Sequence, residues 1–336
     1  MSLIVQKFGG TSLADPASRE MLVRKVAAER AAGNQVVLVV SAMGRRGDPY
    51  ATDTLLDLLK AFPGGADGLV SDLMASCGEV ISACVIAALL ASRGIAATPM
   101  TAYTAGFRVS GAFGDADPAA VDPAGMRAAL ASGIVPVVTG FQGVTPDGGI
   151  ATLGRGGSDT SAVAIGAALG ADFVDIYKDV PGVAVADPRL VPEAPYLDYL
   201  DYDSMFRLAN HGARVLHDKS ALLAKAAGLR MRVRPTFDEG EGTLIGPASE
   251  AAGKAGRPVP SFLGLATSPA EGGSVRMVAV FADGADLAMK VEAANALAGK
   301  AGASGLPCGD PNAVAYLCAK EKSAALASAL VAALAG

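Results

Sequence analysis

The sequence predicts an α/β fold with a mostly parallel sheet, followed by a smaller α+β unit. Near the N-terminus, a strand, a glycine turn, a helix and a second strand follow one another within residues 3–40, which is the order of a parallel βαβ unit. A second glycine-rich turn, residues 154–161, leads directly into an apolar helix. Residues 239–260 are rich in Gly, Pro, Ala and charge, which indicates a linker between domains.

The first half of the chain is expected to alternate strands and helices. Strands are predicted at residues 3–8 and 35–40, around a helix at residues 17–32 that Gly33 and Asn34 close. Further elements are helices at residues 55–59 and 68–92 and strands at residues 94–100 and 134–138. Residues 107–122 are rich in Gly and Asp and favour no regular element.

The second half is expected to complete the large domain and then form the small unit. The glycine-rich turn is followed by a helix at residues 162–169, a strand at residues 174–177 and a turn at residues 178–182. A helix near residues 203–209 and a strand at residues 231–234 follow. Beyond the linker, strands at residues 275–280 and 313–317 and helices at residues 287–298 and 323–334 predict a small α+β unit.

The composition is that of a globular protein. The chain has 336 residues, of which 51% are hydrophobic and 18% charged, and its mean hydropathy is +0.38. Gly, polar or charged residues interrupt its apolar segments before the ~18 residues that a membrane span needs, and the N-terminus has no pattern of a secretory signal. A net charge of −5 disfavours nucleic acid and anionic membranes as partners. We therefore expect a cytoplasmic protein.

Cysteine and histidine are too few and too scattered to predict a metal site. The four cysteines form no C-x-x-C pair, and the two histidines, His211 and His217, are expected to be structural. Free thiols in a reducing compartment are the simplest interpretation of the cysteines: Cys77, Cys84, Cys308 and Cys318.

The two glycine turns are predicted to meet at the carboxyl ends of the parallel strands, where open α/β proteins bind ligands. Glycines let the backbone approach a phosphate closely, and a following helix turns its first N–H groups toward an anion. An ordinary loop that caps a core helix is the alternative, because neither turn has Walker A or G-x-G-x-x-G spacing. Lys7, near the end of a buried strand, favours an anion site unless it reaches solvent from an edge strand.

The segment Lys7-Phe8-Gly9-Gly10-Thr11-Ser12 resembles the signature of aspartokinases, which phosphorylate the β-carboxylate of aspartate with MgATP. Seven further motifs follow in the order and approximate spacing of that family: Ser41-Ala42-Met43-Gly44, Ser76-Cys77-Gly78-Glu79, Gly140-Phe141-Gln142-Gly143, Gly154 to Asp159, Asp179-Val180-Pro181-Gly182, Asp187-Pro188-Arg189, and Gly212 to His217. The resemblance implies an amino-acid-kinase domain, a three-layer αβα sandwich, over residues 1–238. It also implies a linker at residues 239–262 and an ACT-like domain at residues 263–336.

The resemblance implies a phosphoryl site made of four residues. Lys7 would neutralise charge on the transferring phosphoryl group, and Gly9 and Gly10 would donate backbone N–H groups to the same oxygens. Asp159 would orient Lys7 and the reacting groups. From the residues alone, Asp159 is equally well explained as a helix N-cap, a role compatible with catalysis.

The resemblance also implies an amino-acid site. Glu79 would accept the α-ammonium group, and Arg155 would pair with the α-carboxylate through its guanidinium fork. The reacting end of the substrate would lie near the other implied substrate-binding residues, which are Ser41, Thr52 and Ser158. Without the resemblance, Glu79 is more simply a surface or capping carboxylate.

The implied nucleotide residues depart from the family pattern at three positions. Lys178 replaces a common threonine, Ala184 stands where an aromatic residue often lies against adenine, and Arg214 replaces a lysine. The implied nucleotide-binding set is Lys178, Asp179, Gly182, Ala184, Arg189 and Arg214. ATP remains the expected nucleotide, with Mg²⁺ bridging its phosphates and few direct protein ligands.

The function implied is ATP-dependent phosphorylation of L-aspartate to 4-phospho-L-aspartate, an entry step to lysine, threonine and methionine. A kinase of another amino-acid carboxylate and a non-catalytic regulatory or scaffold paralogue are the alternatives. Retention of both the phosphoryl and the substrate charges argues against the scaffold. The C-terminal region suffices for about one ACT-like module where aspartokinases usually carry two, and the family's ligand-loop pattern is missing at residues 282–285. We expect this module to join subunits into a homodimer or larger homo-oligomer.

Overall fold

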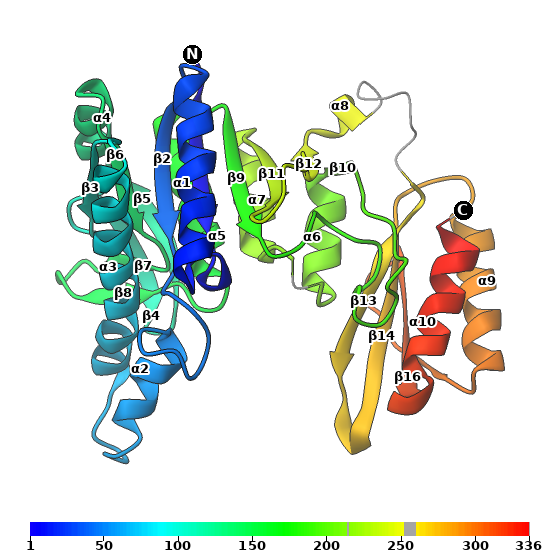
Figure 1. The fold of residues 1–336 in the computed structure, drawn as a ribbon. Coiled ribbons are helices and arrows are strands. Elements are labelled where there is room, and N and C mark those ends of the chain that lie inside the picture. The colour runs from blue at the N-terminus through cyan, green and yellow to red at the C-terminus, as the bar shows by residue number, and fades with distance from the viewer. Residues whose placement is uncertain (214, 252–259, 336) are drawn as a thin grey trace. The chain divides into compact units, whose positions relative to one another are not determined.

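The structure is a computed structural model that describes residues 1–213, 215–251 and 260–335. It divides into two compact units (Figure 1). The first unit comprises Met1–Pro181 and Leu223–Gly242, and the second comprises Gly182–Leu222 and Thr243–Gly336. The domain boundaries expected from the sequence, residues 1–238, 239–262 and 263–336, stay a prediction.

The first unit alternates strands and helices for most of its length. Its elements are β1 (Leu3–Phe8), the 3₁₀ turn η1 (Gly10–Leu13), α1 (Pro16–Ala31), β2 (Gln35–Val40), α2 (Thr52–Leu59), α3 (Gly68–Ser92), β3 (Ala97–Met100), β4 (Phe107–Ala112), β5 (Asp115–Val121), α4 (Ala124–Ala131), β6 (Val135–Thr139), β7 (Gln142–Val144), β8 (Ile150–Thr152), α5 (Gly157–Leu169), β9 (Phe173–Lys178) and β11 (Arg230–Pro235). Helix α7 (Asp218–Ala227) crosses the boundary between the units. The predicted N-terminal βαβ unit is confirmed, with β1 and β2 parallel.

The main sheet of this unit has the order β11-β9-β1-β2-β6-β3, and each adjacent pair is parallel. Buried residues of α1 and α3 pack with Phe8 and Tyr177 on one face of the sheet. Helix α5 covers the other face, where Gly166 fits against Val5 and Val174. The predicted three-layer αβα sandwich with a mostly parallel sheet is confirmed.

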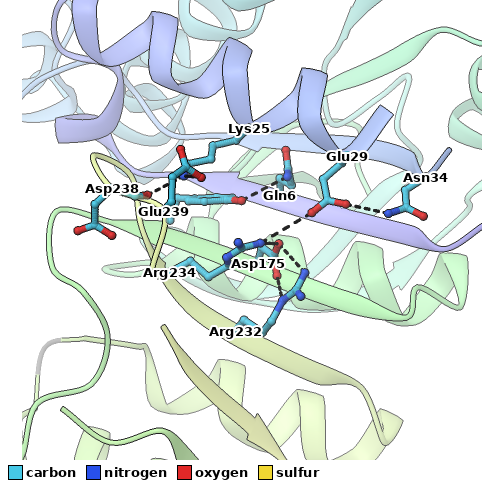
Figure 2. Close-up of polar contacts among 10 residues, drawn as sticks. Gln6, Lys25, Glu29, Asn34, Asp175, Arg232, Arg234, Asp238 and Glu239 are labelled. Atoms are coloured by element: carbon cyan, nitrogen blue, oxygen red, sulfur yellow. Dashed lines mark hydrogen bonds and ion pairs between the residues drawn. The ribbon is translucent and has the colours of Figure 1, made fainter. Parts of the chain in front are cut away.

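Strand β11 is held to β9 by buried charges (Figure 2). Asp175, fully buried on β9, accepts from Nε and Nη2 of Arg232 at 2.6 and 2.8 Å and from Nη1 of Arg234 at 3.1 Å. Glu29 of α1 lies 3.8 Å from Arg234. Because each buried charge has a partner, this network fixes the register of β11 without leaving an uncompensated ion.

Residues 107–122, for which the sequence favoured no regular element, form the β4–β5 hairpin. Phe107 and Val109 of β4 and Ala116 of β5 are buried. The hairpin belongs to a second small sheet of the order β5-β4-β7-β8. Packing of these few apolar residues therefore outweighs a composition that is poor in strand formers.

The second unit contains the small α+β fold. Its elements are β10 (Tyr199–Asp201), α6 (Tyr202–Asn210), β12 (Thr243–Gly246), α8 (Ala248–Ala251), β13 (Phe262–Pro269), η2 (Glu271–Gly273), β14 (Ser274–Phe281), α9 (Leu287–Lys300), β15 (Ser304–Leu306), β16 (Ala313–Ala319) and α10 (Lys320–Leu334). An antiparallel sheet of order β13-β14-β16-β15 packs against α9 and α10 (Figure 1). The predicted small ACT-like α+β unit is confirmed, with β13 and β15 added to the expected strands.

One helix of the described part of the chain, α3, is long and apolar enough to span a membrane. Core helices of soluble proteins meet the same criterion, and half of the most apolar window of α3 is buried within the protein. Buried residues of α3, among them Ile86 and Leu90, pack in the core cluster beside strands β2 and β6. The buried part of this helix therefore belongs to the core of the first unit.

Candidate active site

Two lysines lie on the α5 face of the sheet, at the carboxyl ends of two adjacent parallel strands. Lys7 of β1 pairs in register with Ile176 of β9, so Lys178, two residues later, points to the same face. Strand β1 lies between β9 and β2 in the sheet. The alternative in which Lys7 reaches solvent from an edge strand is therefore wrong, because β1 is central and Lys7 is only 5% exposed.

Both lysines contact one carboxylate from α5. Nζ of Lys7 lies 2.6 Å from Oδ1 of Asp159, and Nζ of Lys178 lies 3.0 Å from Oδ2. Burial acts to raise the pKa of Asp159, but the charges of Lys178 and Lys7 and their hydrogen bonds lower it to about 2. Burial lowers the pKa of Lys7, and the ion pair with Asp159 opposes this shift. Asp159 is thus an ionised carboxylate held between two ammonium groups.

The N-cap interpretation of Asp159 is wrong. The cap of α5 is Gly156, in the left-handed conformation with φ 73°, and no side chain caps the helix with a hydrogen bond to an N–H of the first turn. Ser158 and Asp159 lie inside that turn instead. The side chain of Asp159 is consequently directed at the strand ends rather than at the backbone of its own helix.

The start of α5 approaches the neighbouring loops very closely. A Cβ at Gly140 would lie 2.8 Å from Cβ of Ser158, and a Cβ at Gly157 would lie 2.7 Å from Cβ of Leu153. Phe141 has a φ of 70°, a conformation that is rare for a bulky residue, and its N–H donates to Oγ of Ser161 at 3.0 Å. This packing brings Ser158 within 3.0 Å of Ser41 Oγ, joining two predicted substrate residues.

The first glycine turn is equally tight. A Cβ at Gly10 would lie 2.5 Å from the carbonyl oxygen of Gly44 and 2.8 Å from that of Ala42. At Gly9 it would lie 3.6 Å from Nζ of Lys7. The backbone of this turn therefore runs beside the Lys7 ammonium group, against the loop that follows β2.

Glu79 lies in the interior, and its interpretation as a surface or capping carboxylate is wrong. It is 2% exposed near the middle of α3, and its Oε1 accepts from the Ala42 N–H at 2.9 Å. A Cβ at Gly78 would lie 2.6 Å from Cβ of Ala42, so glycine permits this approach. Burial raises the pKa of Glu79 to about 8, while the Ala42 N–H and the charge of Lys7 act in the opposite direction. Oε2 is buried without a hydrogen-bond partner, which is costly unless a donor arrives.

Asp72 is a buried carboxylate, near the segment that leads to Arg155, that the sequence argument missed. It is buried on α3, and its Oδ2 accepts from the N–H groups of Gly114 at 2.8 Å and Thr152 at 2.7 Å. Gly114 is at the tip of the β4–β5 hairpin, and Thr152 ends β8 shortly before Arg155. The signal was present: Asp72 and Glu79 are the two charged residues of α3, seven positions apart and thus on one helix face.

The other predicted substrate residues are less enclosed. Arg155 is exposed, and no ion pair to its guanidinium is found within the described residues. Thr52 is the first residue of α2 and is partly exposed. Their contacts with a ligand stay predictions.

The predicted nucleotide residues divide between the units. In the first unit, Asp179 pairs with Arg45 at 3.0 Å. In the second unit, Gly182 is buried, Ala184 forms a β-bridge with Tyr196, and Arg189 pairs with Asp187 at 2.6 Å. Arg214 lies outside the described residues. The ammonium group of Lys178 contacts the carboxylate that also holds Lys7, and its expected contact with a nucleotide stays a prediction.

Within the part of the chain that the structure describes, no group of three or more His, Cys, Asp or Glu side chains is placed to hold a metal ion. His211 instead contacts Asp310 at 3.1 Å in the second unit.

Comparison with known proteins identifies the fold and its relatives. The profile of the amino acid kinase family matches residues 2–235. Aspartokinase 1 of Bacillus subtilis is 42% identical over 245 residues, which are 73% of this chain and 61% of the relative. An aspartokinase of Thermus thermophilus is also 42% identical, over 73% of this chain and 59% of its own length. The chain thus spans about three-fifths of the length of these relatives.

Solved structures agree with the fold. The aspartate kinase from Synechocystis superposes with a TM-score of 0.64 and 30% identity, over 99% of this chain and 56% of that one. The E. coli aspartokinase III in complex with aspartate and ADP superposes with a TM-score of 0.65 and 22% identity, over 99% of this chain and 83% of that one. At this last identity, the likeness concerns the fold alone.

Proposed function

Since the chain belongs to the amino acid kinase family, we propose that it transfers the γ-phosphoryl group of ATP to the β-carboxylate of L-aspartate, giving 4-phospho-L-aspartate and ADP. The observation that carries the proposal is the buried cluster of Lys7, Asp159 and Lys178, next to the glycine turn at Gly9. The 42% identity to aspartokinases supports aspartate as the acceptor.

The chemistry needs alignment and charge neutralisation rather than a base. An oxygen of the acceptor carboxylate attacks the γ-phosphorus in line, the new P–O bond forms, and the bond to the bridging oxygen of ADP breaks. Lys7 neutralises charge on the transferring oxygens, and Gly9 and Gly10 donate N–H groups to them. Asp159 accepts no proton in this step, since its low pKa keeps it ionised as the anchor of Lys7.

The amino-acid head of the substrate would be bound by opposite charges. The unpaired Oε2 of Glu79 provides an acceptor for the α-ammonium group in a buried setting. Arg155, exposed and unpaired within the described chain, is available for the α-carboxylate. Ser41 and Ser158, already in contact, line the same region through the loop after β2 and the first turn of α5.

Mg²⁺ fits this site only as part of MgATP. With no cluster of three acidic or histidine ligands in the described chain, the ion would take most of its ligands from the phosphates and water. It would supply neutralisation of the β- and γ-phosphate charge.

Trapping the acyl phosphate as a hydroxamate tests the function directly. The protein is incubated with MgATP, hydroxylamine and a panel of amino acids, and ADP release is followed in parallel. Hydroxamate formation with L-aspartate above all other acids supports the proposal. Preference for another acid identifies a kinase of a different carboxylate, and no turnover with any acid favours a non-catalytic paralogue.

Replacing Arg155 with lysine is expected to raise KM for aspartate about 10-fold while KM for ATP changes little, because the two-pronged bond to the α-carboxylate is lost. Lysine keeps the positive charge, so the change tests geometry rather than charge. Initial rates with each substrate varied in turn measure both constants. A larger increase in KM for ATP than for aspartate would show that Arg155 contacts the nucleotide and not the α-carboxylate.

Replacing Asp72 with alanine is expected to raise KM for aspartate several-fold, about 5- to 20-fold, with a smaller change in kcat. The loss leaves the N–H groups of Gly114 and Thr152 without their acceptor and frees the segment that leads to Arg155. Asp72→Asn is the matched control, because its amide oxygen can accept both N–H groups. Equal KM values for the alanine variant and the wild type would separate Asp72 from the substrate site.

The assembly and location are further parts of the proposal. We expect the antiparallel sheet of the second unit, with α9 and α10, to join subunits in a homodimer or larger homo-oligomer. Light scattering on the full chain measures the subunit number. A cytoplasmic location would give the enzyme access to ATP and to the free amino acid.

A further inference from the structure

Three charged groups meet at the strand ends, and their charges do not cancel. Lys7 and Lys178 each bring one positive charge to Asp159, which supplies one negative charge. The side chains are 7%, 21% and 3% exposed, in the order Lys7, Lys178 and Asp159, so water screens this imbalance weakly. A partly buried site with an excess positive charge attracts an anion.

The neighbouring acidic groups do not remove the excess charge. Glu79 is the other carboxyl close enough to affect the pKa of Lys7, and its own pKa of about 8 keeps it mostly neutral at pH 7 without ligand. Asp179 follows Lys178 in sequence but is paired with the guanidinium group of Arg45 at 3.0 Å. Among the residues that the structure describes, Asp159 is the carboxylate that pairs with the two lysines, so an anionic ligand would supply the missing negative charge.

We propose that Lys178 is a second catalytic cation, which contacts the transferring phosphoryl group together with Lys7. This inference rests on the proposed phosphoryl transfer, and it moves Lys178 from the nucleotide site to the reacting centre. The position of Lys178 carries it: the ammonium groups of two lysines, from the same face of two adjacent strands, contact the two oxygens of one carboxylate. Each ammonium group has three donors and uses one on Asp159, so donors remain for phosphoryl oxygens.

The role of Lys178 is electrostatic. As the acceptor oxygen bonds to phosphorus and the bond to the ADP oxygen breaks, negative charge spreads over the three other oxygens of the phosphoryl group. Lys7 and Lys178 would each donate to one of these oxygens, and no proton is transferred. Asp159 would keep the two ammonium groups in place and reduce their mutual repulsion.

Kinetics of matched variants test the proposal. Lys178→Met keeps the length of the side chain without its charge, and it is expected to lower kcat about 10- to 100-fold while KM for aspartate stays within about 3-fold. Lys178→Arg should recover part of kcat, because it restores the charge. Lys60→Met is the control, since Lys60 lies at the exposed end of α2, where it pairs with Asp57; its kcat should equal that of the wild type.

Nucleotide binding provides a readout that does not depend on the acceptor. Lys178→Met should weaken binding of a non-hydrolysable ATP analogue at least 10-fold more than binding of ADP, which lacks the transferring group. Equal weakening of both nucleotides, or unchanged kcat and binding, would overturn the proposal. The wild type could fail to phosphorylate aspartate while Lys178→Met still weakens binding of the ATP analogue more than binding of ADP. In that case the assigned acceptor is wrong and the role of Lys178 stands.

Discussion

Alanine at position 7 is expected to lower kcat with MgATP and L-aspartate about 100-fold or more, the effect of removing a charge contact made in the transition state. The Lys7 ammonium group is buried and lies 2.6 Å from Asp159. Without the Lys7 ammonium group, Lys178 alone would balance the negative charge of Asp159 next to the transferring phosphoryl group. The hydroxamate assay at saturating substrates measures this change in kcat.

A second buried lysine provides the matched control. Lys25 of α1 is also 5% exposed, and its Nζ donates to the carbonyl oxygen of Asp238 at 2.6 Å and to Glu239 at 2.8 Å (Figure 2). Lys25→Ala should reduce stability but leave kcat within about 3-fold of the wild type. A near-normal kcat for Lys7→Ala, or equal losses of kcat in both variants, would remove Lys7 from the mechanism.

The main architecture could be predicted because its signals are local. Strand, glycine turn, helix and strand at residues 3–40 follow directly from apolar runs and helix ends. The β4–β5 hairpin could not, because the burial of Phe107, Val109 and Ala116 depends on the folded chain around them rather than on the local sequence. Strand β12 was not predicted either, because it has four residues and lies in a segment with the composition of a linker. All four of its residues are buried.

The residues of the candidate site could be predicted, but the directions of their side chains could not. Residue types and the resemblance identified Lys7, Glu79 and Asp159, but the direction of a side chain depends on where a helix starts. Asp159 was compatible with capping until the left-handed Gly156 placed the helix start earlier. The placement of Lys178 required the register of β9 against β1, which a single sequence does not specify.

Glu79 affects both the pH dependence of stability and the proposed binding of substrate, and a single substitution can separate these two effects. In the folded protein without ligand, burial raises its pKa from the ordinary 4.5 to about 8. The folded state therefore holds a proton that the unfolded state releases, and stability from this group falls as pH rises from about 4.5 to 8. A bound ammonium group needs the ionised carboxylate, so substrate binding at pH 7 should release this proton.

Glu79→Gln is accordingly expected to raise KM for aspartate about 100-fold or more, because a buried ammonium group loses its charged partner. The amide oxygen can still accept from the Ala42 N–H, so the fold should be retained. KM at pH 6, 7 and 8 tests the linkage to substrate: for the wild type it should fall as pH rises toward 8, and for the variant this dependence should be lost. A wild-type KM that does not change over this range, with the same value in the variant, would exclude Glu79 from the substrate site.

Glu79→Gln, which weakens substrate binding, should make the protein without substrate more stable at alkaline pH. At pH 8.5 the variant should unfold with a free energy larger by on the order of 4 kcal/mol, since the pKa of Glu79 rises from 4.5 to about 8 on folding and one pKa unit corresponds to about 1.4 kcal/mol. At pH 4.5 the two proteins should differ little. Urea unfolding at both values isolates Glu79, because all other titrating groups are common to the two proteins. Parallel stability curves would mean that the buried carboxyl already has a partner in the unliganded protein. A gain in alkaline stability together with lost aspartate binding would instead identify Glu79 as a group kept at the expense of stability for its ligand.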